Sequence, residues 1–61
     1  MALTTMPNLR DPDAAYAMLL AAHKGLTEAE SHALNARLVL ILMNHVGDMA
    51  ALKQALDLAR A

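Results

Sequence analysis

Residues 27–47, TEAESHALNARLVLILMNHVG, decide the fold. They open with a capping-box pattern, in which the Thr27 hydroxyl accepts from the Glu30 amide and the Glu30 carboxylate accepts from the Thr27 amide. They close with Gly47, a residue type that adopts the left-handed conformation after a helix at little cost. We therefore predict a helix over residues 28–46.

This predicted helix is apolar on nearly every side. With successive residues about 100° apart, its apolar side chains fall into three groups: Leu34, Leu38 and Ile41; Val39, Leu42 and Val46; and Ala36, Leu40 and Met43. A continuous polar stripe is formed by Glu30, Arg37 and Asn44, at seven-residue spacing. Such a helix has to be covered nearly all round, and a large exposed apolar patch usually marks an interface. We therefore predict that this helix forms an interface, either with a second copy of the chain or with a different protein, and a homodimer is favoured.

A shorter helix is predicted on each side of this one. The first begins at Asp11-Pro12-Asp13, which offers a capping side chain, a proline suited to the first helical position and an acid that opposes the positive end of the helix dipole. Gly25 ends it, so that it covers about residues 12–24. Asp48 caps a third helix over about residues 49–60.

The N-terminal residues 1–10 contain Pro7 and show no helical period, so we expect them to form an extended arm. The predicted fold is all-α: a single domain over residues 1–61, with three short helices, the second of them central, packed as a homodimer.

The composition favours the same fold. A chain of 61 residues forms one domain and buries only about 60% of its unfolded surface, so it usually needs disulfides, a metal or oligomerisation. It has no Cys, which excludes disulfides. Its apolar fraction is 57%, but Tyr16 is the only aromatic residue, so a core has to be built from Leu, Ala and Met, which favour helices. The net charge of −1 creates no field that attracts nucleic acid or an anionic membrane.

Two segments bear on where the protein resides. The longest uninterrupted apolar run, residues 38–43, is far shorter than the roughly 20 residues of a membrane span. Residues 1–10 have neither the basic start nor the apolar run of a signal peptide. We expect a soluble, cytoplasmic protein with no nucleic-acid or membrane partner.

No pattern in the chain predicts a catalytic or metal site. Zinc needs three or four converging ligands, commonly His residues one helical turn apart, and His23, His32 and His45 lack that spacing. Glu28 and His32 are one turn apart, which is more typical of a solvated ion pair. We therefore predict a non-enzymatic protein without catalytic residues, metal or cofactor.

The candidate interface residues lie on the second predicted helix. Arg37 and Asn44 are either solvated or buried at a helix crossing, where a polar pair fixes the register, and the sequence leaves both interpretations open. The predicted interface or partner-binding residues are Asn35, Arg37, Leu38, Ile41, Leu42, Asn44 and His45. One alternative is a small-molecule or metal-binding module at a dimer interface, built from His23, Asn35, Arg37 and His45. Another is a DNA-binding regulator, although the second helix offers few of the exposed side chains that contact phosphates and bases.

Several segments resemble those of a known family. They are Pro7-Asn8-Leu9-Arg10-Asp11-Pro12-Asp13, Ala22-His23-Lys24-Gly25-Leu26-Thr27, Leu34-Asn35-Ala36-Arg37-Leu38 and Asn44-His45-Val46-Gly47-Asp48. Together they resemble the small bacterial family known as domain of unknown function 2783, over nearly the whole chain. The resemblance implies a short stand-alone protein encoded beside flavin-dependent oxidoreductases of aromatic catabolism, and hence an accessory or interaction role with a larger enzyme. It carries over no catalytic residue, and it singles out as a partner site the positions that capping does not need: Asn35, Arg37, Asn44 and His45.

Overall fold

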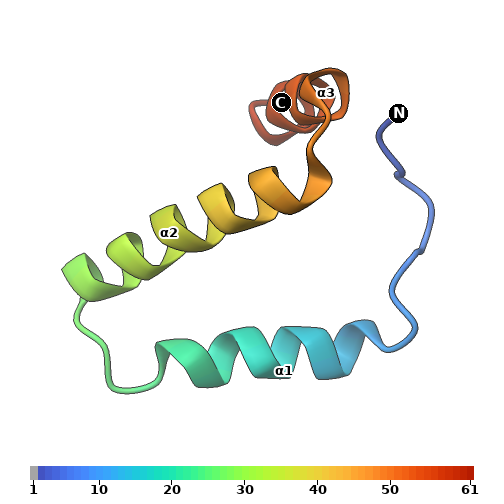
Figure 1. The fold of residues 1–61 in the computed structure, drawn as a ribbon. Helices are drawn as coiled ribbons and strands as arrows, with labels where there is room; N and C mark the ends of the chain where they lie inside the picture. Colours follow the sequence, from blue (N-terminus) through green and yellow to red (C-terminus); the bar gives the residue numbers. More distant parts are fainter. Residues whose placement is uncertain (1) are drawn as a thin grey trace.

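A computed structural model of the protein describes residues 2–61, which form three helices and no strand (Figure 1). The helices are α1 (Pro12–His23), α2 (Glu28–Val46) and α3 (Met49–Ala59). The predicted all-α fold is confirmed. Figure 1 shows α1 and α2 running in opposite directions, with α3 turned across the far end of α2.

The start of α1 has the local chemistry that its sequence predicts. Oδ1 of Asp11 accepts a hydrogen bond from the Ala14 amide at 3.0 Å, and Pro12 occupies the first helical position. The helix ends at His23, one residue before the predicted end. Lys24 already has extended backbone angles, with ψ 128°, and Gly25 follows with a φ of 79°. The chain therefore leaves the helix before the glycine that reverses its direction.

The central helix α2 has both predicted ends. Each half of the capping box is present: the Thr27 amide donates to Oε1 of Glu30 at 2.9 Å, and the Glu30 amide donates to Oγ1 of Thr27 at 3.2 Å. Gly47 ends the helix with a φ of 65°, and its amide donates to the Met43 carbonyl at 2.9 Å. The predicted and observed bounds of this helix coincide.

The third helix begins directly after this glycine. Oδ2 of Asp48 accepts a hydrogen bond from the Ala51 amide at 3.1 Å. The helix ends at Ala59, one residue before the predicted end, with Arg60 as its C-terminal cap. Gly47, the C-terminal cap of α2, and Asp48, the N-terminal cap of α3, are the two residues between these helices. Because the connection is so short, the two helices meet at a sharp angle (Figure 1).

The N-terminal arm returns to α3. The Leu3 amide donates to Oε1 of Gln54 at 2.9 Å, across 51 positions of sequence, and Leu3 is half-buried. Met6 and Leu9, farther along the arm, are exposed. In Figure 1 the arm leads from the start of α1 to the side of α3, so that the chain outlines an open frame.

The interior of this frame holds almost no core. Among residues 2–61, Ala51 is the one residue that is buried, and neither α1 nor α2 contains a buried residue. The most extensive contact between helices is that of α2 and α3, whereas α1 has no extended contact with either. Across the same described residues, no helix has the length and hydropathy needed to cross a membrane.

Candidate interaction surface

The middle of α2 carries a run of apolar side chains, residues 38–43, of which most are exposed. Leu40 and Ile41 retain 66% and 64% of their accessible surface, and Leu42 retains 51%. Leu38 and Met43 at the two ends of the run are half-buried. Four consecutive helical residues point to all sides of a helix, so the exposure of residues 39–42 shows that α2 lacks cover on several sides.

A second apolar surface lies between α2 and α3. An open groove there, called the α2–α3 groove below, is lined by Val39, Met43, Leu52, Ala55, Leu56 and Ala59. A neighbouring groove shares Met43, Leu52 and Leu56 and extends to the exposed Met49. Except for Lys53 in the second groove, every lining residue is apolar.

The predicted interface residues did not include this groove. The sequence prediction named Leu38, Ile41 and Leu42 but no residue of the third helix. Leu52, Leu56 and Ala59 are apolar at helical spacing, so the sequence predicts an amphipathic helix here. It does not predict the angle between α3 and α2. The groove depends on that angle.

His23 and Asn35 connect α1 to α2. Nδ1 of His23 donates to the Leu19 carbonyl within α1 at 2.7 Å, and Nε2 lies 2.9 Å from Oδ1 of Asn35. The Asn35 amide fits either protonation state of the ring, because it offers its oxygen to an imidazolium and, rotated, its NH₂ to a neutral imidazole. Of the four residues in the alternative ligand site, these are the two that the structure brings together.

The remaining polar candidates on α2 are exposed. Arg37, Asn44 and His45 make no side-chain hydrogen bond or ion pair within residues 2–61. In the single chain they are thus solvated, with Leu40 and Ile41 flanking the Arg37–Asn44 stripe. A guanidinium and an amide with unused hydrogen-bonding groups, set among exposed apolar side chains, have the composition of a protein–protein contact.

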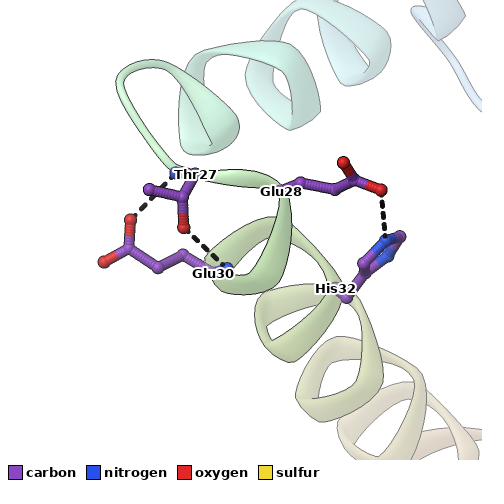
Figure 2. Close-up of polar contacts among 4 residues, drawn as sticks. All are labelled: Thr27, Glu28, Glu30 and His32. Atoms are coloured by element: carbon purple, nitrogen blue, oxygen red, sulfur yellow. Dashed lines mark hydrogen bonds and ion pairs between the residues drawn. The ribbon is translucent and has the colours of Figure 1, made fainter.

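The start of α2 carries two carboxylates and an imidazole, those of Glu28, Glu30 and His32 (Figure 2). Oε1 of Glu28 lies 3.5 Å from Nε2 of His32, and both side chains are exposed, as in a solvated ion pair. The hydrogen bonds from the Thr27 amide and hydroxyl lower the pKa of the Glu30 carboxyl. Within residues 2–61, no three His, Cys, Asp or Glu side chains are close enough together to hold a metal ion.

Comparison with known proteins adds a family but no function. No curated protein and no solved structure matches the chain. A family model described as "Protein of unknown function (DUF2783)" matches residues 3–61. The match includes the arm, all three helices and each of the helix caps described above, and it confirms the resemblance seen in the sequence. The chain is therefore a member of the DUF2783 family of proteins of unknown function.

Proposed function

We propose that this protein is a non-enzymatic interaction protein that works as a self-associated assembly, with a homodimer as its basic unit. The observation that carries the proposal is the near absence of a core: Ala51 alone is buried among the described residues, and large apolar side chains are exposed on the arm and on all three helices.

The solvent-exposed area of the chain is larger than that of a compact protein of the same mass, which supports self-association. The chain exposes 5487 Å², whereas a compact protein of 6.5 kDa exposes about 3,800 Å². The excess is about 1,700 Å² per chain, or about 3,400 Å² for two, which lies in the range of obligate homodimers. A second copy fits this area because it brings an equal and equally apolar surface.

The accessory part of the proposal concerns a larger enzyme, which we take to be a flavin-dependent oxidoreductase on the basis of the family resemblance. The exposed Arg37, Asn44 and His45 are the groups proposed to contact it. No nucleophile–base pair supports turnover by the chain itself: Ser31 has only His32 beside it in sequence, and neighbouring residues of a helix face different directions.

The mass of the purified protein in solution tests the assembly. We expect sedimentation equilibrium at micromolar concentration to give at least twice the mass of one chain. Leu42→Asp should dissociate or unfold the assembly, because it places an unpaired charge in an apolar interface. Leu42→Met is the matched control and should assemble normally, because it conserves volume and polarity. A folded wild-type monomer would contradict the proposal.

Co-purification tests the accessory role. We expect the tagged protein to retain a flavin-containing enzyme of the same cell, identified by its flavin absorbance and by its mass. An assembly that retains no such enzyme would leave self-association standing and remove the accessory role. A purified wild-type chain that turned over a substrate, and lost that activity on replacement of His45, would overturn the non-enzymatic assignment.

A further inference from the structure

We infer that the two copies interlock, so that the second copy lies against all three helices of the first and the two chains share one core. This inference rests on the proposed self-association and goes beyond it, because a dimer could also form by contact along α2 alone. It predicts that no folded monomer exists.

The dimensions of the chain support an interlocked dimer. Its radius of gyration is 13.2 Å. A compact domain of 61 residues has a radius of about 10.5 Å, and one of 122 residues has a radius of about 13.7 Å. A single chain is therefore already as extended as a compact body made of two. Both copies fit into that body only if each occupies the space that the other encloses.

The state of α1 supports the same arrangement. An isolated helix shorter than about 12–15 residues is marginal in water, and α1 has 12 residues, none of them buried. Tyr16 and Leu20 are more than half exposed, and α1 is linked to α2 chiefly through the turn and the His23–Asn35 contact. A partner that touched α2 alone would leave α1 without the packing that stabilises it.

The α2–α3 groove is the part of the proposed interface that involves α3. Its lining residues, including Val39, Leu52 and Leu56, are apolar, and it is open along the angle between the two helices. Because an interface between two identical chains related by a twofold axis is reciprocal, whatever the first copy inserts into this groove, the second inserts into the equivalent groove. All three helices have exposed apolar side chains. A helix of each copy can therefore enter the groove of the other, and each copy then completes the packing of its partner.

Small-angle scattering of the wild-type assembly, together with its mass, tests the inference. An interlocked dimer should have a radius of gyration of about 13.7 Å. For two chains docked side by side, the squared radius of gyration is that of one chain plus the square of half the distance between their centres. With the centres separated by the shortest extent of one chain, 23 Å, the radius of such a dimer should be about 17–18 Å. The larger value at dimer mass would overturn interlocking and leave self-association intact, whereas a compact folded monomer would overturn both.

Dilution and a variant on α1 provide independent tests. Helical circular dichroism and dimer mass should fall together over one concentration range, because the shared core disappears with the dimer. Leu20→Asp should weaken self-association at least tenfold, and Leu20→Met should not. A folded monomer on dilution, or an unchanged dissociation constant for Leu20→Asp, would show that the second copy does not cover α1.

Discussion

Nε2 of His23 lies 2.9 Å from Oδ1 of Asn35, and this contact joins the last turn of α1 to α2 across the turn at residues 24–27. His23 is held from its other side by the Leu19 carbonyl, at 2.7 Å from Nδ1. The ring is thereby fixed in orientation by its own helix and presents its second nitrogen to the neighbouring helix. Because α1 and α2 share no extended packing in one chain, this pair is the side-chain hydrogen bond that joins the two helices beyond the turn itself.

A double-mutant cycle should detect this coupling. We expect His23→Ala and Asn35→Ala to be non-additive by about 0.5–1.5 kcal/mol, the net contribution of one hydrogen bond. Urea unfolding at one fixed protein concentration is the measurement, because association adds to the apparent stability. Single-mutant effects that add to within about 0.3 kcal/mol would mean that the contact is not energetically coupled.

The helix ends should be sensitive to small substitutions. Thr27→Ala and Asp11→Ala each leave a helix amide without its capping acceptor and should cost about 0.5–2 kcal/mol. Gly25→Ala and Gly47→Ala should cost about 1–2 kcal/mol, because alanine resists a positive φ. At Gly25 an added Cβ meets nothing within 4 Å, and at Gly47 it makes an ordinary contact at 3.6 Å. The cost thus comes from backbone conformation, and unchanged urea midpoints in all four variants would contradict these helix ends.

The same caps show which features sequence alone can predict. Thr27 and Glu30 are three positions apart, and so are Asp11 and Ala14, so the geometry that pairs them is local to one helical turn. The contact of Leu3 with Gln54 spans 51 positions, and it depends on the path of the whole chain.

The candidate surface divides in the same way. The apolar run at residues 38–43 could be identified from periodicity, because side-chain direction along one helix follows from spacing. The His23–Asn35 pair and the α2–α3 groove join residues of different helices, and their positions follow from the turns at residues 24–27 and 47–48. The sequence predicts that these turns exist, but it does not predict the angles at which they set the helices.

Acid should remove the contribution that the ionised Glu30 carboxylate makes to the capping box. Hydrogen bonds from Thr27 lower the pKa of Glu30 below its ordinary value of 4.5, so the folded state favours the ionised carboxylate. Its stabilisation is fully present above pH 4.5 and is lost as the pH falls through the lower pKa of the folded state. Glu30→Gln keeps an oxygen acceptor but does not titrate. We therefore expect the stability difference between wild type and Glu30→Gln, measured by urea unfolding, to shrink below pH 4.5. Parallel pH profiles of the two proteins would show that folding does not lower the pKa of Glu30.

Arg37 should act in assembly or partner contact rather than in folding of the helix. It is exposed, and its side chain forms no hydrogen bond or ion pair within residues 2–61. Arginine is enriched at binding hot spots because its flat guanidinium combines an apolar face with five donors. Arg37→Ala should weaken self-association or enzyme capture by about 1–2 kcal/mol, which is roughly a 5- to 30-fold change in dissociation constant. Helix content should stay nearly intact, because alanine is the best helix former.

Lys24→Ala is the matched control for this last prediction. Lys24 is also an exposed cation whose side chain forms no hydrogen bond or ion pair within residues 2–61, and it lies in the turn at residues 24–27, outside the apolar run of α2 and outside both grooves. Lys24→Ala should therefore change sedimentation and enzyme capture much less than Arg37→Ala. If Arg37→Ala also leaves both unchanged, the guanidinium is a solvated surface group, and the partner contact has to be sought on the apolar run of α2 instead.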